Sequence, residues 1–502
     1  MRTKKALVNS FCAGFLEIVN VIMALVVPKL IIDAFGSETN GLIVSITHFL
    51  GYISLMQAGI GNVIRANLYK PLADNDSSAI KAVFHSGEKF FRKLSYFLIL
   101  YILILAVVFP LFVKGEYSFV YVSSLVVVLG LSTLSQYFFG FTCRSLLMAD
   151  QKEFIYSLIQ SISVIISILI ASVLIIKGFG IHIVKLVSLV PFIISPIILN
   201  VYTRKKYKLK DFDINNNIKL SQRWSAFGHS IADFVHRKTD YFVLTLMSTL
   251  FNVSIYSVYS TVINGVYSII SVCASPLQAA LGNIAATDSQ EETNKKLGFI
   301  EYMIHSISTV VFGTCLVMID SFITIYLNKS DDVRYHNGVF ALLIIIAELL
   351  YCCRQPLLSM IMVKGCFKDT QRGAYIEAGI NIVLSVALVT KFGLAGIAVG
   401  TLSAMIFRTI DLFIYVHKTF DYSSVGRIIV RYLVTFGSIF IVYFVHLNLI
   451  DKSNLSLYMW IIYSAITLLS LIILILLSSL TIYRKEFFYL FACLKGMIKK
   501  KN

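Results

Sequence analysis

Charged residues are scarce in this chain, and their scarcity excludes most soluble proteins. Only 14% of the 502 residues are Asp, Glu, Lys or Arg, whereas a soluble globular domain has about 25%. Hydrophobic residues make up 57% of the chain, and the mean hydropathy is +0.80. A helix that crosses ~30 Å of hydrocarbon uses roughly 20 apolar residues. The composition therefore predicts an all-α integral membrane protein in which most of the chain forms spanning helices.

Proline, paired cysteines and catalytic motifs are also scarce or missing. The seven prolines are too few for a proline-rich linker. None of the eight cysteines forms a C-x-x-C pair or clusters with histidine, which predicts free thiols, no disulfide framework and no metal site. The chain has no phosphate-binding loop, no H-E-x-x-H motif and no G-x-S-x-G motif. These absences predict a protein that is not an enzyme and that has no cofactor.

Long hydrophobic runs dominate what is present. They predict about 14 spans, because each run is long enough to cross the membrane and short polar turns separate them. No inter-span segment is long enough for a soluble domain. The expected spans are residues 8–34, 41–63, 94–113, 119–142, 154–176, 182–202, 226–249, 254–280, 299–327, 337–362, 375–391, 393–416, 428–447 and 457–483.

The loops differ sharply in positive charge. The net charge is +17, and most Lys and Arg residues fall in one set of alternate loops, which predicts that this set is cytoplasmic. Both termini then lie in the cytoplasm. The first apolar run is too long for a signal peptide, so we expect a retained first span. The opposite set of loops contains only Lys29, Lys114, Lys177, Lys185, Lys329, Arg334, Lys391 and Lys452.

A basic segment after the sixth span divides the first twelve spans into two sets of six. Residues 1–203 form the expected N-terminal lobe, 204–225 a cytoplasmic linker, and 226–417 the C-terminal lobe. Two additional spans follow within residues 428–483, and a basic cytoplasmic tail occupies residues 484–502. Two similar halves around a central cavity are a recurrent transporter design.

Ionisable residues inside the spans are the strongest candidates for function, because such groups are costly in hydrocarbon. The seventh span contains the densest set, which is Asp233, His236, Arg237, Lys238 and Asp240. Two interpretations remain open: the charges neutralise one another and hold helices together, or they line a water-filled cavity. Lys238 has no acid three or four residues away on its own helix, so we expect its partner to be another helix, water or an anionic ligand.

Further ionisable residues lie in other spans. Glu17 and Glu348 are near the middle of the first and tenth spans, whereas Arg354 and Arg408 are closer to the cytoplasmic ends. Arg408, and more so Arg65, have an alternative role as interfacial anchors whose charged ends reach water.

Residues 352–417 resemble the C-terminal half of bacterial polysaccharide flippases. These belong to the O-antigen branch of the multidrug/oligosaccharidyl-lipid/polysaccharide exporter superfamily. The stretch YISLMQAGIGNVIRANLYKPLADND resembles the second span of the family and its following loop, and Asp240 and Tyr256 resemble an acid–tyrosine pair of its seventh and eighth spans. The glycines usual between that pair are absent here. The matching residues of the C-terminal stretch are Arg354, Gly365, Phe367, Lys368, Thr370, Gln371, Glu377, Asn381, Gly393, Gly396, Gly400 and Thr401.

The resemblance implies an ion-coupled flippase in the bacterial cytoplasmic membrane. Its expected substrate is an oligosaccharide linked to undecaprenyl pyrophosphate, moved from the inner to the outer leaflet by alternating access. H⁺ or Na⁺ and membrane lipids are further expected partners, a polysaccharide polymerase is a candidate partner, and no nucleic acid is expected. The candidate substrate-binding residues are Arg237, Lys238, Arg354, Arg408 and Arg65, and the candidate ion-coupling residues are Glu17, Asp233, Asp240 and Glu348.

Three alternative functions remain at this stage. A lipid II flippase shares the 14 spans, and a multidrug exporter of the same superfamily has twelve spans and an acidic cavity. A membrane glycosyltransferase or ligase is disfavoured because the chain has no large extramembrane loop for acidic catalytic residues.

Overall fold

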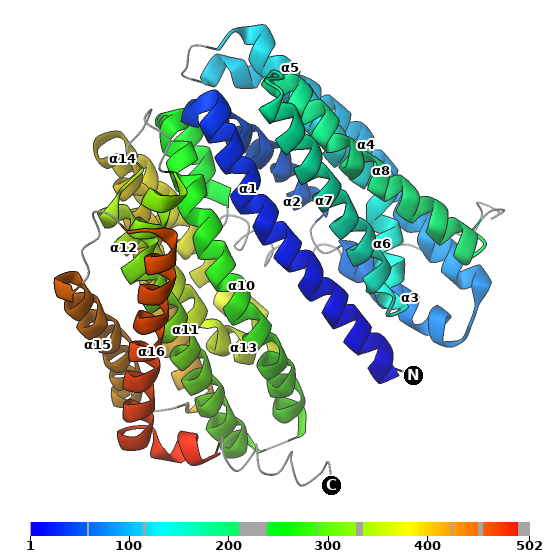
Figure 1. Cartoon of the computed structure of the whole chain (residues 1–502). Helices are drawn as coiled ribbons and strands as arrows, with labels where there is room; N and C mark the ends of the chain where they lie inside the picture. Colours follow the sequence, from blue (N-terminus) through cyan, green and yellow to red (C-terminus); the bar gives the residue numbers. More distant parts are fainter. Residues whose placement is uncertain are drawn as a thin grey trace. The chain divides into compact units, whose positions relative to one another are not determined.

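The chain folds into long α-helices (Figure 1). The structure is a computed structural model and describes residues 2–57, 60–113, 117–209, 238–287, 289–327, 335–422, 425–449 and 455–489. Within these ranges there is no β-strand, and 11 helices are long and apolar enough to cross a membrane. The expected fold class, an all-α multi-pass membrane protein, is confirmed. The count of 14 spans stays a prediction.

Two helices each contain a pair of expected spans, with a sharp bend at a glycine. α1 (Arg2–Leu50) bends at Gly36, where φ is 83°. α14 (Phe367–Phe420) bends at Gly393, where φ is 54° and ψ is −127°. Residues with side chains rarely adopt these positive φ values, so the two glycines allow the chain to reverse or turn. Most of the expected seventh span, residues 226–249, lies outside the described residues.

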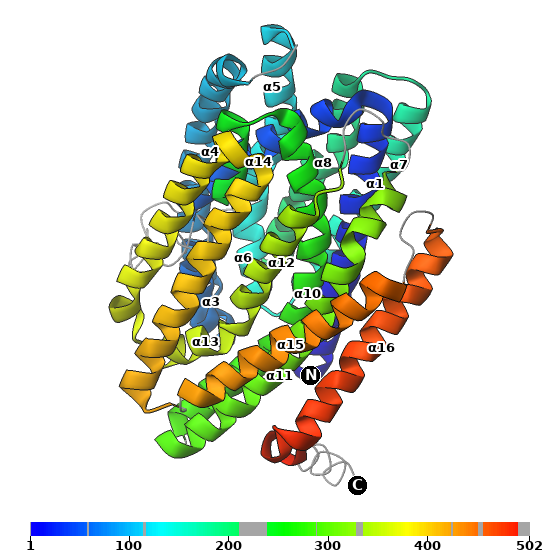
Figure 2. The same cartoon turned by 90° about the vertical axis from the view of Figure 1, so that its left-hand side faces the viewer.

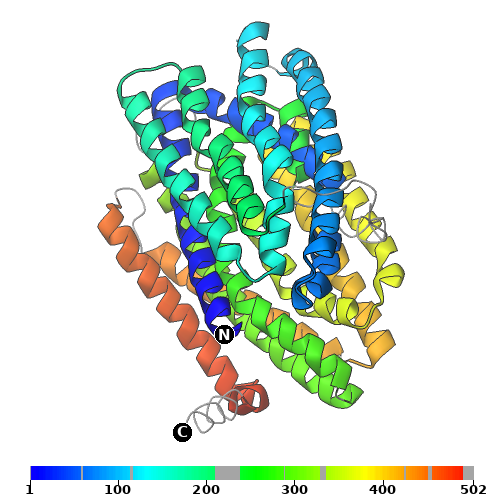
Figure 3. The same ribbon diagram turned by 90° about the vertical axis from the view of Figure 1, so that its right-hand side faces the viewer.

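The chain divides into two compact units, Met1–Ser257 and Val258–Asn502, which we call unit 1 and unit 2. Unit 1 has a core formed by buried aliphatic and aromatic residues from nearly all of its helices. Figure 3 shows its blue to green helices running side by side. They are α1, the 3₁₀ turn η1 (Gly51–Ile53), α2 (Ser54–Gln57), α3 (Ile60–Ala73), α4 (Ser77–Phe112), α5 (Phe119–Ser135), the π-helical turn η2 (Gln136–Gly140), α6 (Phe141–Ala149), α7 (Glu153–Ile176), α8 (Ile181–Lys206) and the start of α10 (Leu250–Thr287).

Unit 2 contains the rest of α10 and all later helices. The two helices that correspond to the expected additional spans both pack against α11. Figure 2 shows the two limbs of α14 side by side, in yellow and orange. The helices after α10 are α11 (Gln290–Tyr326), α12 (Gly338–Cys353), α13 (Gln355–Val363), α14, α15 (Val425–Leu449) and α16 (Leu457–Thr481).

Several helices begin at polar residues that cap their first turns. The side chains of Asp76, Ser118, Ser289 and Ser456 each accept a hydrogen bond from a backbone N–H of the first turn of α4, α5, α11 and α16. Such caps satisfy donors that a helix leaves unpaired at its start. Many large aliphatic and aromatic residues of the same helices are exposed, as expected for surfaces that face lipid rather than water.

Candidate functional site

Four charged side chains of unit 2 form a buried ion cluster, which we call the 354–411 cluster. Arg354 Nη2 donates to Glu377 Oε1 at 2.6 Å, and Arg408 Nε lies 3.4 Å from Glu377 Oε2. Arg408 Nη1 also donates to Asp411 Oδ2 at 2.6 Å. One carboxylate therefore joins two of the arginines that the sequence nominated for substrate binding. Glu377 was noted only for its place in the family motif, although it is the centre of the cluster.

The hairpin of α14 brings these side chains together. Glu377 lies on its first limb, and Arg408 and Asp411 lie on its second. Arg354 lies at the junction of α12 and α13, where Pro356 follows in the first turn of α13. The limbs approach closely, because Asn381 Nδ2 donates to Thr401 Oγ1 at 3.0 Å between them.

Glycines make this close approach possible. A Cβ on Gly373 would lie 2.0 Å from Asp411 Oδ2 and 2.2 Å from Arg408 Nη1, so a side chain there would displace the ion pair. A Cβ on Gly400 would lie 2.4 Å from Ser385 Oγ, and one on Gly396 would lie 2.5 Å from the Leu388 carbonyl oxygen. The glycines of the family motif thus permit the limbs to pack at short distance.

Arg354 keeps hydrogen-bonding capacity that the cluster does not use. Its side chain is buried, and its Nε and Nη1 donors have no acceptor among the described residues. Its guanidinium also lies 5.0 Å from the ring centre of Tyr351. A buried guanidinium with unmet donors is costly unless an anion or water supplies the missing acceptors. Arg408 differs, because Glu377 and Asp411 both engage it and its side chain is buried, unlike an anchor that reaches interfacial water.

A second buried ion pair joins α11 to α15 and was not anticipated from the sequence. Arg431 Nη1 donates to Glu301 Oε2, and Arg431 Nη2 donates to the Gly298 carbonyl oxygen at 3.0 Å. The Tyr422 hydroxyl donates to the same oxygen of Glu301. Only 2% of Arg431 is exposed. Its position within the first turn or two of the thirteenth expected span was the available signal, but its partner lies 130 residues away.

In unit 1, Lys238 finds a partner on another helix, as expected. Its Nζ lies 3.2 Å from Nδ1 of His48 on α1, so the histidine nitrogen accepts when it is unprotonated. The His48 ring stacks on Tyr241, with ring centres 3.5 Å apart. Asp240 is buried, and the Tyr256 hydroxyl donates to its Oδ2 at 2.8 Å. The acid and tyrosine that carried part of the family resemblance are therefore in direct contact.

The remaining nominated residues do not join these clusters in the contacts observed. Arg65 donates to Asn62 Oδ1 and lies 3.4 Å from Met148 Sδ. Glu17 is exposed and Glu348 is half-buried. Asp233 and Arg237 lie outside the described residues. The assignments of all nominated substrate-binding and ion-coupling residues stay predictions.

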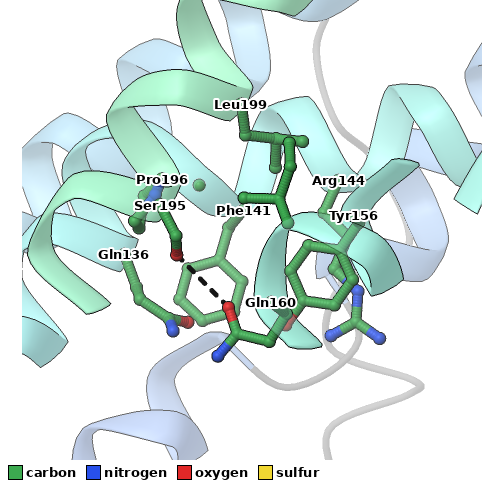
Figure 4. A pocket seen from close by; sticks show the side chains of 10 residues that line it. Gln136, Phe141, Arg144, Tyr156, Gln160, Ser195, Pro196 and Leu199 are labelled. Carbon is green, nitrogen blue, oxygen red and sulfur yellow. Dashed lines mark hydrogen bonds between the residues drawn. The ribbon is translucent and has the colours of Figure 1, made fainter. Parts of the chain in front are cut away.

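A small pocket in unit 1 lies beside the π-helical turn η2 (Figure 4). Ser195 Oγ donates to Gln160 Oε1 at 3.2 Å on one wall. On another wall, Arg144 lies 4.2 Å above the Tyr156 ring and pairs with Glu153 at 3.1 Å. Since this arginine is already paired, the pocket offers mainly amide and hydroxyl groups, which bind sugar hydroxyls or water. The sequence analysis did not identify it.

Comparison with solved structures identifies the fold. The chain resembles an inward-facing MATE family multidrug transporter of the MOP superfamily, with TM-score 0.59 and 13% identity over 80% of this chain and 94% of that one. It also resembles a ligand complex of the MATE multidrug transporter DinF-BH (0.55, 14%, 82% and 95%). A third similar structure is a mutant of the Vibrio cholerae MATE transporter VcmN (0.55, 12%, 83% and 96%).

These similarities show that the chain has the fold of MATE transporters of the MOP superfamily. No family model and no curated protein sequence matches the chain. The polysaccharide-flippase branch that residues 352–417 resemble therefore remains a prediction, whereas the superfamily fold expected from that resemblance is confirmed.

Proposed function

We propose that this protein is a membrane transporter that moves a lipid-linked anionic oligosaccharide between leaflets by alternating access. The observation that carries the proposal is Arg354, a buried guanidinium with two donors unmet among the described residues, inside a transporter-type fold. We place the protein in the bacterial cytoplasmic membrane with both termini inside, because of the charge bias of its loops.

Physical chemistry favours such a substrate for a buried arginine. A pyrophosphate-linked sugar chain is polar and anionic, so its unaided passage through hydrocarbon costs many kcal/mol. Guanidinium groups bind phosphate oxygens through charge-assisted hydrogen bonds. Arg354 is held by Glu377 through one nitrogen, which leaves its other nitrogens for a ligand while its position stays constant. A polyprenyl tail needs no such site, because it remains soluble in the lipid.

The family motif supports the same proposal through its arrangement in space. Arg354, Glu377, Asn381, Gly400 and Thr401 all belong to the motif, and all lie at the α14 hairpin or contact it. The residues that carry the sequence resemblance therefore build the 354–411 cluster and its support.

The proposal is tested by deleting the gene in a bacterium that makes the glycan and following the lipid-linked repeat unit. We expect the repeat unit to be made but to stay accessible only from the cytoplasmic side. The wild-type chain restores export, Arg354→Lys restores part of it, and Arg354→Gln restores little while accumulating normally in the membrane. Loss of repeat-unit synthesis would instead indicate an enzyme, and normal export would contradict the proposal.

A multidrug exporter is the second candidate, because similar structures are described as multidrug transporters. Increased susceptibility of the deletion strain to cationic dyes, with normal glycan export, would favour this alternative. A third outcome, a block in peptidoglycan synthesis with lipid II retained inside, would favour lipid II as the substrate.

A further inference from the structure

We propose that Asp320 is a proton-binding site of unit 2, with Tyr259 as the residue that senses its protonation and His336 as its proton donor and acceptor. This inference rests on the proposed transport function and names H⁺ as a coupling ion. None of the three residues belongs to the candidate sites derived from the sequence.

Three helices meet at Asp320 through one tyrosine. The hydroxyl of Tyr259, on α10, donates to Asp320 Oδ1 on α11 at 2.8 Å. The same hydroxyl oxygen accepts from the backbone N–H of Asn337 at 3.0 Å. Asn337 caps α12, since its side chain accepts from the Phe340 N–H at 3.1 Å. The tyrosine is 0% exposed, so its hydrogen bonds are protected from competing water.

The tyrosine has a second acceptor within reach. Its hydroxyl lies 3.2 Å from the backbone carbonyl oxygen of Tyr335, but it carries only one hydrogen. With Asp320 ionised, that hydrogen points to the carboxylate. When Asp320 gains a proton, its new O–H donates to the Tyr259 oxygen, and the tyrosine hydrogen turns to the Tyr335 carbonyl. One proton enters, no covalent bond to carbon changes, and the link between α10 and α11 reverses its direction.

His336 provides the route for the proton. The Asp320 side chain is 20% exposed, and the His336 side chain is 53% exposed, with Nδ1 at 3.7 Å from Asp320 Oδ1. Imidazole takes up and releases protons near neutral pH, so it suits a relay between water and a carboxylate. The sequence places residues 328–337 in a loop expected to face the outside. Protons would then reach Asp320 from the external medium.

Other charges are distant or absent on the helices that pack around this site. α10 and α16 contain no Asp, Glu, Lys, Arg or His. On α12 the only charged residue is Glu348, about three turns from the helix start. α15 contributes Arg427, Arg431 and His446, and the nearest ionisable residue on α11 itself is His305. Residues 328–334 lie outside the described part of the chain.

Trp460 provides a readout that does not depend on transport. The chain has two tryptophans, and Trp224, which lies outside the described residues, can be replaced by phenylalanine. Trp460 Nε1 donates to the Met318 carbonyl oxygen at 3.1 Å, and its ring centre lies 5.2 Å from that of Phe322. These contacts lie on either side of Asp320 along α11, so Trp460 emission reports on the helix at the proposed site.

The test is a pH titration of purified Trp224→Phe protein in lipid nanodiscs. We expect Trp460 emission to change with a single midpoint between about pH 4 and pH 7, the range of ordinary carboxyl and imidazole groups. Asp320→Asn abolishes the change, Tyr259→Phe reduces its amplitude, and His336→Gln moves the midpoint. The matched control is Thr324→Val, which removes a side-chain hydrogen bond to the Asp320 backbone and leaves the carboxylate unchanged. We expect this control to titrate like the parent.

Two results would overturn the inference: a flat titration of the parent, or a full response in Asp320→Asn. The substrate proposal fails separately. If the parent and Asp320→Asn titrate as expected but deletion of the gene leaves glycan export unchanged, the proton site stands and the proposed substrate is wrong. If glycan export depends on the gene but its pH dependence is the same in Asp320→Asn, the proton site does not couple to transport and the inference is wrong.

Discussion

At the scale of single residues, Gly373 shows how little space surrounds the 354–411 cluster. Arg408 and Asp411 occupy the volume that a Cβ at position 373 would need. The sequence could not reveal this requirement, because Gly373 follows a charged stretch and has no neighbouring turn signal. It becomes visible only when both limbs of α14 are in place.

We predict that Gly373→Ala destabilises the protein by about 1–3 kcal/mol, the usual cost of an overpacked interior position. The measurement is thermal unfolding of the purified protein in detergent. Gly379→Ala is the matched control on the same helix, because a Cβ there meets nothing within 4 Å. Alanine favours helix over glycine by roughly 1 kcal/mol, so the control is expected to be neutral or stabilising. Equal melting temperatures for the two variants would contradict the packing argument.

The Glu301–Arg431 pair leads to a second prediction at this scale. Arg431→Met leaves the Glu301 carboxylate buried while the Tyr422 hydroxyl still donates to it, so we expect a loss of about 3–5 kcal/mol. Adding Glu301→Leu removes the uncompensated charge and restores part of the stability. A double-mutant cycle on the free energy of unfolding measures this coupling. Additive effects would mean that the two residues do not act as a pair.

At the scale of helices, the sequence predicts existence and order better than contacts. Apolar runs predicted most of the helices, and the motif around Gly393 lies at the bend of α14. Hydropathy cannot detect a kink inside one continuous run, so α1 was expected as two separate spans. Contacts such as Tyr259 with Asp320, 61 residues apart, depend on how helices pack. The pairing of Asp240 with Tyr256 was accessible only because a family pattern linked them.

The bend of α14 gives a prediction about a whole element. Gly393→Ala places a side chain at positive φ, which costs about 1–3 kcal/mol. Because the bend brings the limbs together, we also expect weaker export if the protein is the proposed transporter. Gly437→Ala is the control, since its Cβ meets nothing within 4 Å inside α15. The ratio of export to membrane-accumulated protein separates loss of function from loss of folding, and unchanged melting and export would contradict the role of the bend.

At the scale of the whole molecule, the fold and the loop charges together define what remains to be tested. The similarity to MATE transporters covers about four-fifths of the chain, and the last two helices pack on α11 in unit 2. The orientation in the membrane rests on the positive charge of alternate loops alone.

Topology is checked by cysteine labelling in a variant that lacks the eight native cysteines. We expect Lys206→Cys, at the end of α8, to be protected from a membrane-impermeant thiol reagent in intact cells. Asp331→Cys, in a loop outside the described residues, is expected to react. Labelling at position 206 together with protection at position 331 would reverse the proposed orientation.

The central claim is that this chain by itself moves a lipid-linked glycan across a bilayer. The most direct measurement reconstitutes the purified protein into liposomes that contain the lipid-linked repeat unit in both leaflets, and follows how much of it an external glycan-modifying enzyme can reach. We predict that the wild-type protein exposes the inner-leaflet pool, that Arg354→Gln slows this exposure at least tenfold, and that liposomes without protein retain the pool. If wild-type and protein-free liposomes expose the same fraction, the protein is not the flippase.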